Sequence, residues 1–93
     1  MTMTTGYIIR VVRFENGAPC PISGQFLESF DHEADGGRGF GTFTRRISRA
    51  MVFDTIKEAM AFRDRQSTVM PLRPDGEPNR PLSCTTINIE PLP

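Results

Sequence analysis

The chain has 93 residues, which is the size of one small domain that can fold alone, and we expect residues 1–93 to form a single domain. Eleven basic and eleven acidic residues give a net charge of zero. A general nucleic-acid binder needs excess positive charge to displace counterions, so this balance argues against one. Seven phenylalanines and a run of β-branched residues exclude a wholly disordered chain.

The two cysteines and the N-terminal sequence indicate a protein of a reducing cytoplasm. The opening MTMTTGYIIR lacks the basic and apolar regions of a signal peptide, and we expect residues 1–6 to be disordered. No stretch approaches the ~18 apolar residues of a membrane span. Cys20 and Cys84 do not match a zinc site or a redox C-x-x-C motif. We expect both thiols to be free, although the spacing leaves a disulfide open.

The N-terminal half predicts strands. Residues 7–14, YIIRVVRF, are rich in β-branched residues and predict the first strand. A turn at Asn16-Gly17 and a proline-rich loop follow, because Asn-Gly tolerates the positive φ of tight turns. Residues 25–30 predict a second strand, a candidate partner of the first, and residues 41–45 predict a short third strand.

The following residues predict the main helix. We expect a turn of helix around Ser48 and Arg49 and a short strand at residues 51–53. Thr55 and Glu58 then have the spacing of a capping box, which predicts a helix over residues 55–66. Its expected apolar side, packed on the sheet, consists of Ile56, Ala59, Met60 and Phe62.

The C-terminal part combines a proline-rich segment with a final strand. Residues 71–83 carry four prolines, which predict an extended surface segment that Leu72 and Leu82 pin to the domain. Residues 84–90, CTTINIE, alternate in polarity and predict a half-buried strand. The element order predicts an α+β fold, with one helix packed on a small antiparallel sheet as a two-layer sandwich.

Residues 31–42, DHEADGGRGFGT, partly match a calcium loop. Asp31, Glu33 and Asp35 occupy its first, third and fifth positions, where the ion needs oxygen ligands. The twelfth position is Thr42, so the closing carboxylate is absent, and a strand precedes the loop where an EF-hand has a helix. We therefore expect a solvated, glycine-rich turn.

Candidate catalytic residues are scarce. His32 is the only histidine, and it lies in this loop without a predictable nucleophile nearby. A Cys–His pair with Cys20 or Cys84 would need a tertiary contact that the sequence does not predict. We expect a surface histidine, and a protein that is not an enzyme and holds no metal or cofactor.

Two groups of residues are candidates for binding a partner. Arg38 and the cluster Arg45, Arg46 and Arg49 form the densest positive patch, suited to phosphates or an acidic protein face. The alternative is that these arginines pair with the acids of residues 31–35. The proline-rich segment is expected to display a second group, with the partner-binding residues Arg73, Asn79 and Arg80 beside Asp75 and Glu77.

Three stretches resemble small uncharacterised proteins encoded by proteobacterial phages and prophages. They are GGRG at residues 36–39, AMVFDTIKEAMAF at 50–62 and QSTVMPLRPDGEPNRPL at 66–82. Small phage proteins that lack catalytic residues often bind host machinery, and some inhibit host defence as anti-CRISPR proteins do. By analogy, the resemblance implies a host protein or protein complex as the partner.

The expected function is therefore a non-catalytic protein-interaction module. One alternative is a nucleic-acid-binding accessory protein that uses the arginine patch, and a third is a small metal protein or enzyme. These functions differ in what the protein would retain: a discrete protein, nucleic acid in a salt-dependent manner, or stoichiometric metal.

Overall fold

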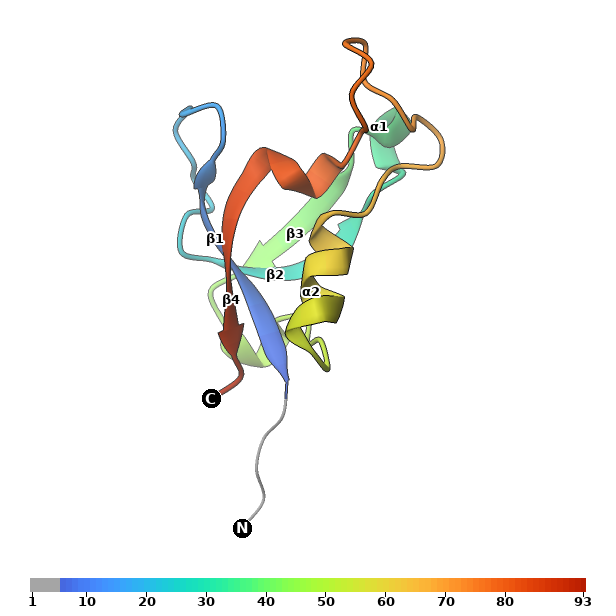
Figure 1. Cartoon of the computed structure of the whole chain (residues 1–93). Helices are drawn as coiled ribbons and strands as arrows, with labels where there is room; N and C mark the ends of the chain where they lie inside the picture. Colours follow the sequence, from blue (N-terminus) through green and yellow to red (C-terminus); the bar gives the residue numbers. More distant parts are fainter. Residues whose placement is uncertain (1–5) are drawn as a thin grey trace.

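The computed structural model describes residues 6–93 of the chain (Figure 1). The elements follow one another as β1 (Tyr7–Phe14), β2 (Phe26–Asp31), α1 (Ala34–Gly37), β3 (Phe40–Thr44), the 3₁₀ turn η1 (Ile47–Arg49), α2 (Ile56–Arg63), the 3₁₀ turn η2 (Pro81–Cys84) and β4 (Thr85–Pro91). The four strands form one antiparallel sheet in the order β3-β2-β1-β4. This arrangement confirms the predicted α+β class with one main helix on a small sheet.

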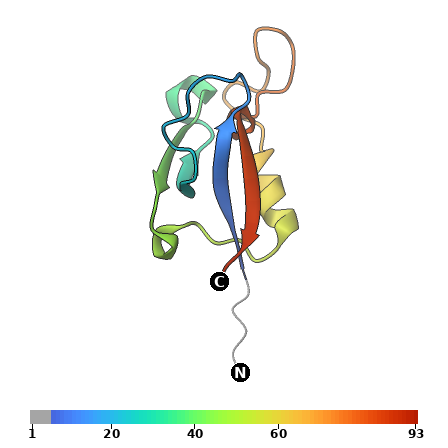
Figure 2. The same ribbon diagram turned by 90° about the vertical axis from the view of Figure 1, so that its left-hand side faces the viewer.

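The sheet consists of two long ladders that meet over a short contact. The first ladder pairs β1 with β4 and the second pairs β2 with β3. Between them, β1 and β2 share the single register pair Arg10↔Phe26, and in Figure 1 the β1–β4 pair crosses in front of β2 and β3. Figure 2 shows that α2 lies beside β4, at one edge of the sheet. The helix therefore packs at the β1–β4 end of the sheet without pairing with the backbone of β4, and leaves the β3 side to other segments.

The main core lies between the sheet and α2. It consists of buried apolar residues from both ladders, the helix and η2: Ile9, Leu27, Phe53, Ala59 and Leu82. Ile87 and Ile89 pack against this cluster, as expected from the alternation in residues 84–90. A second, smaller cluster of Ile8, Phe26 and Ala50 is covered in part by Leu92.

The capping box predicted for the main helix is present. The Thr55 side chain accepts a hydrogen bond from the Glu58 N–H (3.0 Å), and the Glu58 carboxylate accepts one from the Asp54 N–H (3.2 Å). The helix ends at Arg63 rather than at residue 66, because the Arg65 N–H bonds to the carbonyl of Phe62 and closes a tighter turn.

The predicted apolar face of α2 is only partly correct. Ala59 is fully buried and Phe62 packs against the core, but the side chains of Ile56 and Met60 are exposed to 52% and 41%. The reason is the position of the helix at the β4 edge, where one side of it extends past the sheet (Figure 2). Apolar residues are therefore available on this side for contacts outside the domain core.

Two smaller predictions need correction. Residues 51–53 form no strand of their own, since Phe53 makes only an isolated bridge with Tyr7 through two hydrogen bonds of 2.8 Å. Gly6, which was expected to be disordered, is buried and its carbonyl accepts a hydrogen bond from the Leu92 N–H. The other residues of the predicted disordered tail, 1–5, lie outside the described residues. Within the described part of the chain, no helix has the length and apolar character needed to cross a membrane.

Candidate functional site

The acidic residues of the calcium-like loop point to different partners. The carboxylate of Asp31 accepts a hydrogen bond from the Glu33 N–H (2.9 Å), and that of Asp35 lies 3.9 Å from Arg38. The backbone reverses at Asp35, Gly36 and Gly37, which have φ values of 53°, 65° and 95°. The predicted glycine-rich turn is confirmed, and its geometry disperses the carboxylates instead of gathering them.

Glu33 connects this turn to a loop more than thirty residues later in the chain. Its carboxylate accepts hydrogen bonds from the hydroxyls of Ser67 and Thr68 (both 2.5 Å) and from the Thr68 N–H (2.8 Å). These donors, led by the Ser67 hydroxyl, lower the pKa of Glu33 to about 2. The carboxylate therefore holds the start of the 67–80 segment against the turn.

This contact predicts a specific loss of stability in acid. Because the folded state holds the pKa of Glu33 near 2, below its ordinary 4.5, the carboxylate contributes its full stabilisation above pH 4.5 and loses it as the pH falls towards 2. Replacing Glu33 by Gln should lower the melting temperature at pH 7, and the difference from wild type should shrink steadily between pH 4.5 and pH 2. Thermal melts followed by circular dichroism test this, and a difference that stays constant over that range would contradict it.

His32 is not the surface residue that the sequence predicted. Its side chain is only 2% exposed, its Nε2 lies 2.9 Å from the Phe62 carbonyl, and its ring makes edge-on contacts with Phe30 and Phe62. The pKa of His32 is lowered, mainly because burial disfavours the charged form of the ring. The ring is therefore a neutral part of the packing between β2 and α2, held by aromatic contacts that a single sequence does not reveal.

The proline-rich segment forms a hairpin rather than the extended surface segment that the sequence predicted. The Arg73 N–H bonds to the Glu77 carbonyl, the Gly76 N–H bonds to the Arg73 carbonyl, and Leu72 bridges to Pro78. Proline fixes φ and Asp75-Gly76 supplies the turn, so the chain folds back on itself. The η2 turn follows immediately, where an extended chain was expected.

The anchoring of this hairpin also differs from the prediction. Leu82 is buried as expected, but Leu72 is 55% exposed. Asn79, predicted to be displayed to a partner, is 6% exposed, and its amide donates to the carbonyls of Gly37 (2.6 Å) and Met70 (2.9 Å). Asn79 is therefore the residue that fixes the hairpin to the turn, while Arg73 and Arg80 remain on its surface.

The turn and the hairpin together form one side of a cleft of about 710 Å³. Arg38 comes from the turn, Arg73 and Arg80 come from the hairpin, and the β1 end of the cleft contributes Phe14 and Glu15. Arg38 and Arg73 each pair with a nearby exposed acid, Asp35 at 3.9 Å and Asp75 at 3.2 Å. Such exposed pairs are weak and exchange readily for another carboxylate. We name this feature, lined by Arg38, Arg73 and Arg80, the arginine cleft.

The structure divides the predicted arginine patch. Arg38 precedes β3 and lies at the arginine cleft, whereas Arg45, Arg46 and Arg49 follow β3 and lie around η1 at the other end of that strand (Figure 1). Arg49 pairs with Glu28 at 3.4 Å, and Arg45 and Arg46 are exposed. The sequence grouped the four by proximity in the chain, and it gave no signal for the long-range contact of Asn79 with Gly37 that holds the hairpin beside Arg38.

The remaining predicted features are simple to place. Cys20 and Cys84 are both free thiols, as expected, and Cys84 borders the arginine cleft.

The chain matches no protein-family model, no curated protein and no solved structure. The resemblance to phage-encoded proteins therefore stays a hypothesis, and the function must be inferred from the geometry of the chain alone.

Proposed function

We propose that the protein is a non-catalytic protein-interaction module, and that the arginine cleft binds an acidic segment of its partner. The observation that carries this proposal is the convergence of Arg38, Arg73 and Arg80 from two separate segments on one cleft. Guanidinium groups form paired, charge-assisted hydrogen bonds with carboxylates. A partner carboxylate needs only to displace the exposed local acids that pair with Arg38 and Arg73.

The choice of a protein over a nucleic acid rests on charge. The chain is neutral overall, and Glu15 also borders the cleft, so the positive field is local and limited. A nucleic-acid-binding accessory protein is the second candidate, and the exposed Arg45 and Arg46 beside η1 favour it. Binding to DNA or RNA would fall steeply with added salt.

The partner and the compartment are proposed from the sequence. The free thiols fit a reducing cytoplasm, and the resemblance to phage proteins suggests a bacterial host protein as the partner, with inhibition of host defence as one outcome. These narrower statements depend on the resemblance, and the arginine cleft does not depend on them.

Two triple variants test the proposal. Changing Arg38, Arg73 and Arg80 to Ser should leave the melting temperature nearly unchanged and reduce capture of a discrete bacterial protein by about tenfold or more, because several charge-assisted contacts are lost. The matched control changes Arg45, Arg46 and Arg49 to Ser, which alters the net charge equally at the other end of β3. Equal capture by wild type and the cleft variant would contradict the proposal, and loss in the control alone would move the binding face to η1.

A further inference from the structure

The sheet has two edge strands, β3 and β4, and the outer edge of β4 has unpaired backbone groups. Antiparallel ladders alternate between residues that bond to the neighbouring strand and residues that face outward. The Leu92 N–H bonds to the Gly6 carbonyl and the Glu15 N–H bonds to the Cys84 carbonyl, which fixes the alternation at both ends of the β1–β4 ladder. The N–H and C=O groups of Ile87 and Ile89 therefore face away from β1, on the open side of β4.

This open edge is short, because both of its ends are occupied. At the start of β4, the outward Thr85 N–H bonds to the Leu82 carbonyl, and the Thr85 carbonyl accepts from Arg63 Nη2 at 3.1 Å. At the far end, Pro91 has no N–H to offer. Ile87 and Ile89 are left with two donors and two acceptors, enough to pair with a segment of a few residues.

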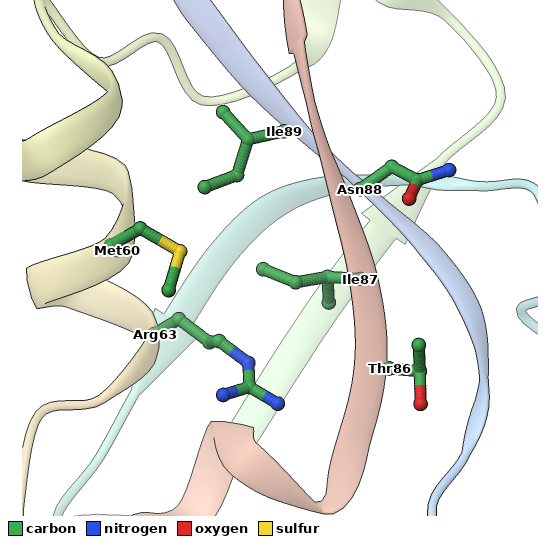
Figure 3. A pocket seen from close by; sticks show the side chains of 6 residues that line it. All are labelled: Met60, Arg63, Thr86, Ile87, Asn88 and Ile89. Atoms are coloured by element: carbon green, nitrogen blue, oxygen red, sulfur yellow. The ribbon is translucent and has the colours of Figure 1, made fainter.

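An apolar groove runs along the same edge. It has a volume of about 250 Å³ and lies between α2, which contributes Met60 and Arg63, and the β4 residues 86–89. Figure 3 shows the side chains of Ile87 and Ile89 directed toward the helix, whereas Thr86 and Asn88 point to the opposite side of the strand. A strand added to β4 would thus place every second side chain in the groove, beside Met60.

Arg63 closes one end of this groove. Its guanidinium donates to the Thr85 carbonyl (3.1 Å) and to the Asp64 carboxylate (3.0 Å) and lies 3.9 Å from Glu15, while its Nε is a buried donor without a hydrogen-bond partner in the described part of the chain. A strand running antiparallel to β4 would bring its carboxyl terminus to this guanidinium, where it would take the place of the exposed Asp64 carboxylate. A parallel strand would bring an amino terminus to the same place, which offers the guanidinium no hydrogen-bond acceptor.

We propose that the groove between α2 and β4 binds the carboxyl-terminal segment of a partner protein as an additional antiparallel strand. Two apolar side chains at alternate positions lie opposite Ile87 and Ile89, and the terminal carboxylate lies at Arg63. Backbone pairing provides the affinity and the groove selects the side chains. This surface is separate from the arginine cleft, so the proposal does not depend on the function proposed above.

A second copy of the chain fits this edge poorly. Two β4 strands paired about a two-fold axis would carry their α2 helices on the same face of the joined sheet. Because α2 lies beside β4 (Figure 2), the two helices would come close together at the new strand pair. A single extended segment has no helix of its own and avoids this crowding.

The test uses the full chain and a library of random heptapeptides with free carboxyl termini. Selection should enrich Val, Ile or Leu at two positions separated by one residue near the terminus. Amidating the terminus of a selected peptide should weaken binding about tenfold or more, because the charge-assisted contact is lost. In the complex, amide hydrogen exchange at Ile87 and Ile89 should slow, as expected for newly paired groups.

A pair of helix variants provides the matched control. Met60→Glu should reduce the affinity for the selected peptides about tenfold or more, since Met60 lines the groove. Ile56→Glu makes the same charge change one turn earlier on α2, at a residue that does not line it, and should bind as wild type does. Recovery of no peptide, equal binding of amidated peptides, or unchanged binding by Met60→Glu would each overturn the proposal. Purification of a dimer joined through β4 would overturn it as well.

Discussion

Replacing Leu27 by Ala should lower the free energy of unfolding by about 3 kcal/mol. Leu27 is fully buried at the centre of the main core, beside residues from β1, α2 and η2. Truncation removes apolar contacts and leaves a cavity that the two ladders and the helix cannot close. A domain of this size has a total stability of ~5–15 kcal/mol, so the loss is a large fraction of it.

Phe40→Ala is the matched control for this change. Phe40 begins β3 and is 65% exposed, so its truncation should alter the stability by less than about 0.5 kcal/mol. Urea denaturation followed by circular dichroism suits this chain, which has no tryptophan for fluorescence. Equal destabilisation by the two variants would mean that the core is assigned to the wrong face of the sheet.

The strands and the helix start were predictable because local signals determine them. The β-branched residues of β1 have few alternatives to a strand, and the Thr55–Glu58 capping box marks the first turn of α2 through hydrogen bonds between near neighbours. The alternation in residues 84–90 likewise placed Ile87 and Ile89 toward the core. In each case the deciding contacts lie within the element itself.

The position of α2 at the sheet edge could not be predicted from the sequence, for a physical reason. Ile56 and Met60 have the spacing of the core-facing side of a helix. An apolar residue gives the same sequence pattern whether it packs in a core or lies exposed at the surface. Only the order β3-β2-β1-β4, with α2 at the β4 edge, distinguishes these two environments. The exposed side of α2 therefore shows in the sequence only as two residues, Ile56 and Met60, that the prediction wrongly assigned to the core.

The sequence did not predict the arginine cleft, for a different reason. Its arginines are exposed and polar, as predicted, but the contacts that bring them together are long-range. These contacts use polar side chains to which the sequence assigned no structural role. Glu33 reaches residues 67–69, and Asn79 reaches Gly37. Asparagine and glutamate side chains are common on surfaces, so composition assigned these two to solvent or to a partner.

Asn79 is thus expected to affect stability rather than recognition. Replacing it by Ala should lower the free energy of unfolding by about 2–3 kcal/mol, because the carbonyls of Gly37 and Met70 lose their donor in a largely buried place. The 67–80 segment should in addition open locally, since Asn79 fixes it to the turn. Amide hydrogen exchange should therefore rise throughout the domain with the lower global stability, and should be fastest in the 67–80 segment.

Arg80→Ala is the matched control for Asn79→Ala. Arg80 is the next residue and is exposed, so its truncation should change the free energy of unfolding by less than about 0.5 kcal/mol. The contrast matters for any test of the arginine cleft, because Asn79→Ala would release the hairpin that carries Arg73 and Arg80. Reduced binding in that variant would then arise from a displaced cleft and not from a lost contact. Wild-type stability and exchange in Asn79→Ala, together with lost binding, would contradict this account and return Asn79 to the binding face.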